Sequence, residues 1–414
     1  MENKKITTNN LDSNIYTLFL CGGRWQLPWL SYLKTKGHKI ILVDPYSNSP
    51  CVNHADVFFK EDVKNTDSII KYILDNGFNI EAVTSEQTDV SALPVAIISK
   101  KLGLDYSDPS IVERFTNKGV SRSFLKKNYK THFPEFKIIN SFEELLEFIN
   151  KFKNIIIKPV DSQSSRGVYH IKKPYNLNEL KITYDICVSF SSEKQIIAEQ
   201  FIEGNEITLE GICLNKKHYT LTGSNKKHFR TGIASELSYP LLINQNLKHE
   251  LYAFHNDLIE KTGINNAITH AEYIIDEVNN NFSLVEMACR GGGSLIPSHI
   301  VPLVTKIDLY DLYYQAIFKK NNINNLEVEN NYFVTLHFFE FPSGKVESIE
   351  GLERCKNFKC VIDIGLEFKV GDAIENAQDD RSRQGYVIVS GDSKESISSN
   401  LKLIYETISI KYVS

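Results

Sequence analysis

Several features that would point directly to a protein class are missing from this chain. The seven cysteines include no Cys-x-x-Cys pair, which argues against a zinc ribbon or a disulfide scaffold. No hydrophobic run approaches the ~20 residues of a membrane span, and residues 1–10 lack the apolar core of a signal peptide. We therefore expect a cytoplasmic protein whose thiols are reduced and mostly buried.

A strong excess of charge is also missing. The chain has 47 lysines and arginines against 51 aspartates and glutamates, and its lysine pairs are scattered along the sequence. A net charge of −4 provides no field that would attract nucleic acid or an anionic membrane. We therefore predict small-molecule partners, and neither nucleic acid nor a membrane.

Length and composition are typical of a multidomain enzyme. The 414 residues correspond to about three domains, and 42% hydrophobic with 24% charged residues is ordinary for a globular chain. A chain of this size buries a sizeable core without disulfides or a structural metal.

The first hundred residues alternate between short apolar runs and helical patterns. We predict strands at residues 15–21, 39–43 and 80–84, and helices at residues 25–36, 68–75 and 92–102. This alternation favours a parallel sheet covered by helices on both faces. Three acids near the expected strand ends, Asp44, Glu86 and Asp89, are candidates for recognising a substrate amine.

A glycine pair, Gly22-Gly23, follows the first predicted strand, and Asp44 lies 22 residues beyond Gly22. This arrangement invites a dinucleotide-binding interpretation, but the third, spaced glycine of that fingerprint is absent. A nicotinamide cofactor is therefore disfavoured. The turn remains a candidate for holding an anion at a helix N-terminus.

Beyond residue 108 the pattern changes. A predicted helix at residues 110–127 places Lys118 and Arg122 on one face, and Ser141-x-x-Glu144 is typical of a capping box that opens a helix to residue 151. Strands then predominate, at residues 154–158, 195–199, 206–214, 218–224 and 268–276, with one long helix at 247–261. The tail contains predicted strands at 333–341 and 385–389 and a final helix at 394–408.

The most informative segment spans residues 268–293. Two strand-like runs flank a cluster of three asparagines, and a hairpin that turns about Asn279 places Glu272 directly opposite Glu286. Two facing carboxylates repel each other, and Mg²⁺ is commonly held by one or two carboxylates plus substrate phosphates. Two alternatives stay open: both side chains face water, or a register shift of one residue puts them on opposite faces.

Arg290 follows four residues after Glu286 and precedes three glycines. Glycines let a backbone approach a ligand closely, and an arginine beside a carboxylate–metal pair can stabilise developing oxyanion charge. The alternative is a flexible connector with a surface arginine.

Lys158 ends an apolar run and is followed by a loop of small hydroxylated residues and Gly167. Such a loop is suited to approach phosphate oxygens, although it is not a Walker A loop, which opens a helix with Gly-Lys-Ser/Thr. The alternative is a surface turn. Further along, residues 198–206 offer backbone groups for a purine edge and a carboxylate for ribose hydroxyls, a weak signal when taken alone.

Taken in order, these motifs resemble those of a known superfamily. The series runs Asn117-Lys118-x-x-x-Arg122, Lys158-Pro159-Val160-Asp161 with Ser164-Ser165-Arg166-Gly167-Val168, Glu199-Gln200-Phe201-Ile202 with Gly204 and Glu206, His270-x-Glu272, and Glu286-Met287-Ala288-x-Arg290-x-Gly292-Gly293. The series resembles the ATP-grasp superfamily, and within it the carboxylate–amine ligases of the L-amino-acid ligase type. The resemblance covers nearly the whole chain.

The resemblance implies a mixed α/β and α+β fold in three parts. Residues 1–112 would form a Rossmann-like parallel-sheet domain, and residues 113–325 a two-subdomain ATP-grasp core with its internal boundary near 195–205. Residues 326–414, with Arg381-x-Arg383-x-Gly385, would form a small β-rich C-terminal domain. A homodimer is compatible with the resemblance.

The resemblance also implies roles for individual residues. Lys118 and Lys158 would hold the phosphates of ATP, and Lys158 would also assist catalysis. For ATP, the resemblance assigns Ser164, Ser165 and Gly167 to a lid over the phosphates, Glu199, Gln200, Phe201 and Ile202 to the adenine hinge, and Glu206 to the ribose. It assigns Glu272 and Glu286 to Mg²⁺, with Mn²⁺ as an alternative. Arg290 would act on the reaction intermediates, and His270, Gly292 and Gly293 would contact the substrate.

Two positions depart from the superfamily pattern. Ser164 stands where many relatives have glycine, and Ala288 stands where many have an asparagine that binds a second metal ion. Serine in the lid keeps a hydrogen-bond donor but costs some flexibility. The alanine leaves open whether the site holds one metal ion or two.

The implied activity is an ATP- and Mg²⁺-dependent ligase. It would activate a small carboxylate, expected to be an amino acid, as an acyl-phosphate and join it to an amine, releasing ADP and phosphate. No cysteine has a plausible His–acid partner for thiol catalysis. The alternatives are a bicarbonate-using carboxylase or nucleotide-biosynthesis enzyme on the same fold, and a non-catalytic nucleotide-binding module.

Overall fold

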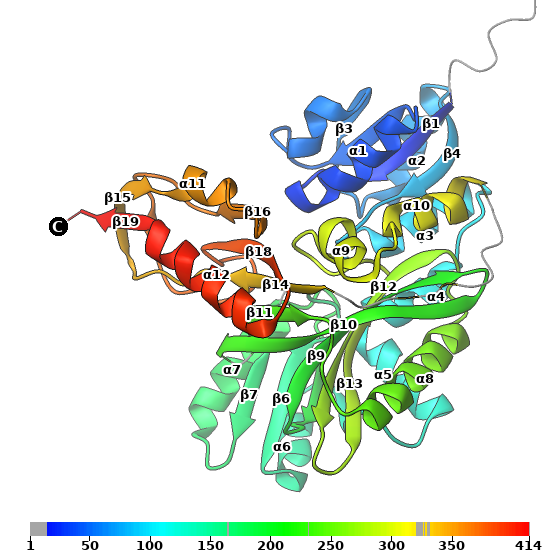
Figure 1. Cartoon of the computed structure of the whole chain (residues 1–414). Helices are drawn as coiled ribbons and strands as arrows, with labels where there is room; N and C mark the ends of the chain where they lie inside the picture. Colours follow the sequence, from blue (N-terminus) through cyan, green and yellow to red (C-terminus); the bar gives the residue numbers. More distant parts are fainter. Residues whose placement is uncertain are drawn as a thin grey trace, which may run out of the picture.

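The computed structural model describes residues 15–163, 165–230, 232–319, 326, 328 and 332–413 (Figure 1). Its first sheet has the order β3-β2-β1-β4, and every neighbouring pair is parallel. The strands are β1 (Ile15–Leu20), β2 (Ile40–Asp44), β3 (Val57–Lys60) and β4 (Asn79–Thr84), and the helices are α1 (Leu27–Thr35), α2 (Thr66–Asp75) and α3 (Ala92–Lys101). All five residues of β2 are buried, as expected for a central parallel strand. The predicted N-terminal parallel sheet is confirmed.

The single helix predicted at residues 110–127 is wrong, because two helices occupy this segment. They are α4 (Pro109–Thr116) and α5 (Lys118–Asn128), and Asn117 separates them with an extended backbone. The Asn117 side chain accepts hydrogen bonds from the amides of Gly119 and Val120 and so caps α5. Lys118 and Arg122 nevertheless lie one turn apart on α5, as predicted.

A second, antiparallel sheet has the order β5-β8-β6-β7. Its elements are β5 (Phe136–Ile139), α6 (Phe142–Lys151), β6 (Asn154–Pro159), β7 (Tyr169–Lys172), α7 (Leu177–Ser189) and β8 (Ile196–Gln200). Helix α7 was not predicted, because its several β-branched residues have low helix propensity. It forms because Asn176 caps its N-terminus and because Leu180, Tyr184 and Cys187 are buried in the core of this sheet.

The largest sheet runs in the order β13-β12-β9-β10-β11-β14-β18-β16, with every pair antiparallel. Its strands are β9 (Asn205–Leu214), β10 (Lys217–Arg230), β11 (Ile233–Tyr239), β12 (Ala267–Asp276), β13 (Asn281–Ala288), β14 (Phe333–Phe338), β16 (Val361–Leu366) and β18 (Gly385–Gly391). Helix α8 (Gln245–Thr262) packs against β10. The predicted domain boundary at residues 325/326 lies in the segment before β14. Because β14 pairs with β11 of the core, the C-terminal strands extend the sheet of the core.

The other elements complete the C-terminal part and the junction with the N-terminal domain. They are the three-stranded sheet β17 (Ala373–Ile374), β15 (Gly344–Glu350) and β19 (Ser409–Tyr412) and the helices α9 (Val301–Thr305), α10 (Leu309–Tyr314), α11 (Leu352–Lys356) and α12 (Lys394–Thr407). Short 3₁₀ helices η2 (Arg24–Gln26) and η3 (Pro50–His54) and short π-helices η4 (Ile296–Ile300) and η5 (Gln315–Lys319) connect other elements. One hydrophobic core joins Trp29 and Leu33 of α1 to Tyr310 and Tyr313 of α10. Figure 1 shows α9 and α10 between the N-terminal domain and the large sheet. No helix in the described ranges is long and apolar enough to cross a membrane.

Candidate active site

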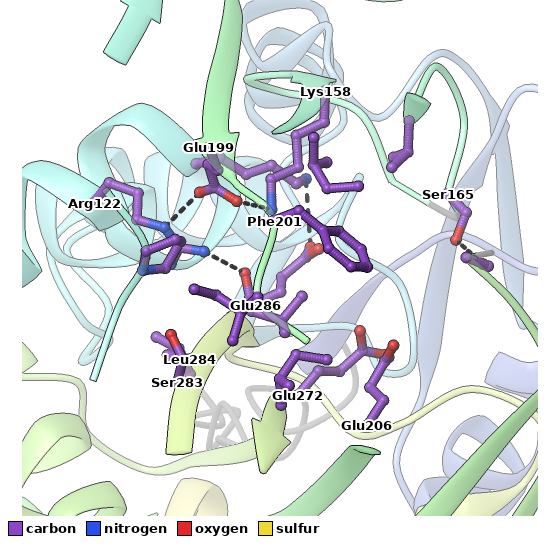
Figure 2. Close-up of a pocket in the computed structure, with 18 of the residues that line it drawn as sticks. Arg122, Lys158, Ser165, Glu199, Phe201, Glu206, Glu272, Ser283, Leu284 and Glu286 are labelled. Carbon is purple, nitrogen blue, oxygen red and sulfur yellow. Dashed lines mark hydrogen bonds and ion pairs between the residues drawn. The ribbon is translucent and has the colours of Figure 1, made fainter. Parts of the chain in front are cut away.

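A cavity with an empty volume of ≈ 1000 Å³ lies between the second sheet, α5 and the large sheet (Figure 2). Residues from each predicted nucleotide-binding motif line it. They are Lys118, Arg122, Lys158, Ser162, Gln163, Ser165, Arg166, Glu199, Gln200, Phe201, Ile202, Glu206, Lys226, Glu272, Ile274 and residues 283–286, together with Pro134, Ile156, Pro159, Val168 and Gly232. We call it the first cavity.

A second cavity, with an empty volume of ≈ 1810 Å³, opens beside the first. Its walls come from three parts of the chain: residues 23–26 and 87–89 of the N-terminal domain, strands of the large sheet with the loop that carries Arg290, and C-terminal residues from Glu367 to Tyr386. His270 and Gly293, both predicted substrate residues, also line it.

Among the described residues, five line both cavities. They are Gln163, Ser165, Lys226, Glu272 and Glu286. The two predicted metal ligands therefore lie where the cavities meet, with side chains that are 25% and 35% exposed. Ligands bound in the two cavities would contact each other at these carboxylates.

The hairpin places Glu272 directly opposite Glu286, as predicted, but by a different route from the one expected. Near the turn the pairs are Asp276 with Asn281 and Tyr273 with Leu284, one residue away from the predicted register. An irregularity between Glu272 and Tyr273 leaves Val285 unpaired and restores the predicted register at the glutamates. Such bulges are common next to active sites, where they re-aim a side chain.

A two-carboxylate site of this kind suits Mg²⁺. Mg²⁺ is usually held by one or two carboxylates together with waters and substrate phosphates, so a larger cluster is not required. Among the described residues no group of three or more His, Cys, Asp or Glu side chains could hold a metal ion. Ala288, which pairs with His270 across the hairpin, offers no side-chain oxygen for a second ion.

Lys226 of β10 is a site residue that the sequence analysis missed. Its Nζ donates hydrogen bonds to Glu206 Oε1 at 2.5 Å and to Glu272 Oε1 at 2.7 Å. Burial lowers the pKa of Lys226, but these two carboxylates outweigh burial and raise it above its ordinary value. In Figure 2 the carboxylates of Glu206 and Glu272 lie close together. In the sequence Lys226 is only one of two adjacent lysines, and the strand predicted at residues 218–224 ends before it.

A buried ion cluster forms one wall of the first cavity. Glu199 Oε1 lies 2.5 Å from Arg122 Nε, and Glu199 Oε2 lies 2.7 Å from Lys158 Nζ (Figure 2). Burial raises the pKa of Glu199, but the two cations outweigh it and lower that pKa to about 2, while burial lowers the pKa of Lys158. Arg122 also donates to the Val285 carbonyl at 2.7 Å, which ties α5 to the bulge. The Glu199 side chain thus holds Lys158 in place, a role that the hinge assignment did not include.

The residues after Glu199 are positioned by backbone contacts. The Gln200 amide donates to the Glu135 carbonyl at 2.8 Å, and the Phe201 amide donates to the Asn154 carbonyl at 3.1 Å. The Phe201 ring stacks on His170 with ring centroids 4.1 Å apart. Gln200, Phe201 and Ile202 together line one side of the first cavity, as expected of a hinge.

Ser165, a residue of the predicted lid, lines both cavities. Its Oγ donates to the Gly232 carbonyl at 2.7 Å and lies 3.4 Å from Asp380 Oδ2 in the C-terminal part. Gly167 has a φ of 73°, and an added Cβ would lie 2.9 Å from Phe190 and Pro159 atoms, so glycine is required there. Lys118 Nζ donates to the Ser162 carbonyl at 2.6 Å and lies 3.4 Å from Glu286 Oε1. The predicted lid residue Ser164 lies outside the described residues.

His270 contacts a buried acid beneath the second cavity. Its Nδ1 lies 2.8 Å from Glu210 Oε1, and Tyr239 donates to the same oxygen at 3.2 Å. Burial lowers the pKa of His270, but Glu210 outweighs burial and raises it to about 9. His270 is therefore a cation near neutral pH. A Cβ on Gly292 would lie 3.1 Å from His270 Nδ1, so this glycine permits close packing rather than lining the cavity.

Arg290 is held by Asp89 of the N-terminal domain. Its Nε and Nη2 donate to the two oxygens of Asp89 at 2.9 and 2.8 Å. Glu86 accepts from the Gly291 amide at 2.6 Å, and burial raises its pKa to about 7. Asp44 accepts from the Gly22 amide at 2.7 Å and from Ser49 Oγ at 2.6 Å, and it lines neither cavity. All three N-terminal acids thus bind protein groups, and of the three Asp89 also lines the second cavity.

Two protein-family models match parts of this chain. Residues 151–298 match a model described as "ATP-grasp domain", and residues 337–413 match "L-amino acid ligase C-terminal domain 2". Residues 151–298 therefore contain an ATP-grasp domain, and enzymes with this domain use ATP and Mg²⁺. The C-terminal residues correspond to a domain described for L-amino acid ligases.

Two curated relatives are both named formate-dependent phosphoribosylglycinamide formyltransferase. The protein from Francisella tularensis subsp. tularensis is 27% identical over 212 residues, which is 48% of this chain and 51% of the relative. The protein from Prochlorococcus marinus is 27% identical over 183 residues, 42% of this chain and 44% of the relative. The chain thus spans about half the length of the curated relatives it matches.

Solved structures match over nearly the whole chain. The L-amino acid ligase from Bacillus licheniformis has a TM-score of 0.77 at 17% identity, covering 97% of this chain and 99% of the other. The phosphoribosylglycinamide synthetase from Anaerococcus prevotii has a TM-score of 0.72 at 20% identity, covering 97% and 100%. At these identities the likeness establishes the fold.

Proposed function

We propose that the protein is an ATP- and Mg²⁺-dependent ligase that joins a small carboxylate, an amino acid in the simplest case, to an amine. The main support is the meeting of the two cavities at Glu272 and Glu286. The first cavity is lined by residues suited to a nucleotide, and the second by paired charges and an apolar wall suited to a small polar substrate. A phosphoryl group transferred from a ligand in the first cavity to a ligand in the second would move past Glu272 and Glu286.

The chemistry explains why such a junction is needed. A carboxylate is a poor acyl donor because its leaving group would be oxide, and phosphorylation replaces that leaving group with phosphate. The acyl-phosphate must then be kept from water until the amine attacks. Positioning and electrostatics supply most of the catalysis in phosphoryl transfer, so lysines and arginines rather than a nucleophilic serine or cysteine are expected at the site.

We assign the residues of the first cavity to ATP. Lys118 and Lys158 bind phosphates, with the loop at 162–168 above them, and residues 199–202 contact the adenine. Glu206 binds the ribose once Lys226 releases it. Glu272 and Glu286 would hold Mg²⁺, which neutralises phosphate charge when it is bound.

We assign the cations of the second cavity to the substrate and its intermediates. Arg290 stabilises the oxyanion formed when the amine attacks, because two of its N–H donors are not used by Asp89 or Gly291. His270, charged near neutral pH, orients the carboxylate beside Glu272. Gly293 leaves room for the substrate, since nothing lies within 4 Å of a Cβ built on it.

A second candidate uses a one-carbon acid. It is supported by the curated relatives, which are named as formate-dependent enzymes, and by a Hydrogenobacter thermophilus biotin carboxylase domain solved with bicarbonate, at 15% identity and a TM-score of 0.72. Formate or bicarbonate would then take the place of the amino acid. The C-terminal match to L-amino acid ligases favours the first candidate.

Release of ADP from the purified protein tests both candidates. Mixtures of amino acids with Mg²⁺ and ATP should stimulate ADP release, and mass spectrometry should detect an amide product. Stimulation by formate or bicarbonate alone would support the second candidate. A protein that binds ATP but releases no ADP with any carboxylate and amine would be a non-catalytic binding module.

A further inference from the structure

The loop between β4 and α3 is hydrogen-bonded to the segment that carries Arg290. Glu86 Oε1 accepts from the Gly291 amide at 2.6 Å, and Gln87 Oε1 accepts from the Leu295 amide at 3.1 Å. Asp89 accepts two hydrogen bonds from Arg290. Three side chains within four positions of the N-terminal domain therefore hold one short loop some 200 residues further along the chain. We call residues 86, 87 and 89 the clamp.

Two further hydrogen bonds hold the clamp residues themselves in place. Glu86 also accepts from the Tyr310 hydroxyl at 3.0 Å, and Gln87 Nε2 donates to the Trp25 carbonyl at 2.7 Å. Glu86 and Gln87 are buried, and the Asp89–Arg290 pair is largely covered. A bidentate pair shielded from water fixes both the position and the plane of a guanidinium.

The geometry of the pair leaves part of Arg290 available. An arginine has five N–H donors. Asp89 takes one donor from Nε and one from Nη2, and the Gly291 carbonyl takes one from Nη1 at 2.9 Å. Among the described residues no partner is seen for the remaining donors, one on each terminal nitrogen, and Arg290 lines the second cavity. These two donors suit a bidentate contact with an oxyanion.

We propose that Asp89 is a positioning residue for Arg290, and that through the clamp the N-terminal domain sets the geometry of the reaction centre. This inference rests on the role of Arg290 in the proposed function. Without Asp89 the guanidinium is drawn toward Glu86 and Glu286, whose charges also act on it. Asp89 lies in the wall of the second cavity, and both of its oxygens accept from the guanidinium, so that it keeps Arg290 directed at the substrate.

Hydrogen exchange tests the clamp without any substrate. Asp89→Asn keeps the side-chain size but replaces one acceptor with a donor that faces Arg290. Amide exchange in the peptide spanning residues 288–296 should speed up about 10-fold or more as the loop opens locally. Asp56→Asn is the matched control, since Asp56 accepts from Lys34 at 2.9 and 2.7 Å in the same domain and lines neither cavity. Unchanged exchange in Asp89→Asn would overturn the clamp.

A double-mutant cycle tests the positioning role. In the wild-type background, Asp89→Asn should lower kcat about 100-fold with little change in the KM for ATP, because small displacements of a catalytic group are costly. In an Arg290→Ala background the same substitution should change kcat less than about 2-fold, since there is no longer a guanidinium to position. Asp89→Glu, which restores a carboxylate, should recover part of the loss.

The two experiments separate failure of the inference from failure of the proposed function. Equal losses from Asp89→Asn in both backgrounds would show that Asp89 acts only on stability, which overturns the positioning role. A wild-type protein that releases no ADP with any carboxylate and amine would end the proposed function, and the positioning role with it. The exchange experiment would still decide whether the clamp holds the loop.

Discussion

The two cavities are built in different ways. Most of the residues that line the first cavity belong to short contiguous motifs, such as residues 199–202 and the loop after Lys158. The second cavity draws its walls from the N-terminal domain, the large sheet and the C-terminal strands, which lie hundreds of residues apart. A local motif can thus specify a nucleotide-type cavity, whereas a substrate cavity made from distant segments depends on how the domains pack.

The largest expected effect comes from removing a carboxylate where the cavities meet. Glu286→Gln keeps the shape but halves the charge available to a cation, and we expect turnover to fall about 1,000-fold, as for loss of a group that acts on the transition state. Calorimetry should also show weaker Mg²⁺-dependent nucleotide binding. Glu277→Gln, in the turn of the same hairpin, is the control and should leave both measurements unchanged. Equal turnover and equal nucleotide binding in the two variants would show that Glu286 has no role in transfer between the two cavities.

Lys226→Met sharpens the comparison, because Lys226 is the lysine shared by both cavities. Its loss leaves Glu206 and Glu272 facing each other without the lysine that bridges them. We expect the free energy of unfolding to fall by about 3 kcal/mol and Mg²⁺ to restore part of it, measured by urea unfolding with and without the metal. Lys227→Met is the control, because Lys227 is 70% exposed and should cost under about 1 kcal/mol. A loss that Mg²⁺ does not relieve would contradict this account.

The pH dependence of stability tests the buried acid Glu86, which lies beside the N-terminal wall of the second cavity and binds the Gly291 amide. Burial raises the pKa of Glu86 from 4.5 to about 7, so the folded state binds a proton more tightly than the unfolded state. The stability that this proton contributes is present below pH 4.5 and is lost as the pH rises through 7. Glu86→Gln should therefore match the wild type at pH 4 and exceed its stability at pH 8, by up to about 3 kcal/mol.

Urea unfolding of both proteins at the two pH values measures this difference. Glu81→Gln is the control, and its effect should have the opposite sign. A hydrogen bond from His38 lowers the pKa of Glu81, so this variant should be less stable than the wild type at pH 8. A constant difference between Glu86→Gln and the wild type across the range would show that Glu86 does not titrate as expected.

The smallest expected effect lies at the outer edge of the second cavity. Arg24 of the N-terminal domain donates to Glu367 at 2.8 Å and to the Tyr386 hydroxyl at 2.7 Å. Arg24→Met should raise the KM for the substrate a few-fold and leave the KM for ATP unchanged, because the contact is exposed and weak. Initial rates at varied substrate and ATP measure the two constants. Parallel changes in both would indicate that the cavities are not independent.

The sequence predicted most of the first cavity because its signals are local. Lys158 at the end of an apolar run and the facing glutamates of the hairpin could be recognised from spacing alone. The bulge at Val285 could not, because nothing local marks it and the carbonyl at the bulge is bound by Arg122 from α5, a distant segment. The predicted pair of glutamates is present only because this irregularity corrects the register of the hairpin.

Other residues were missed because their partners are distant in sequence. Lys226 appeared to be one of several scattered lysines until the large sheet placed it against Glu206 and Glu272. Helix α7 was missed because its propensity is poor and its stability comes from tertiary burial. Asp89 was a candidate for contacting a substrate amine, but its pairing with Arg290, 201 residues away, could not be read from the sequence.

The sequence by itself determined the parallel N-terminal sheet, the order of the motifs and the identity of the acids at the junction, because hydrophobic periodicity and short spacings are local properties. Only the tertiary structure decided which charges neutralise one another and which remain available to a ligand. The reason is physical: charge pairing depends on distances of a few ångströms between side chains that folding brings together from opposite ends of the chain.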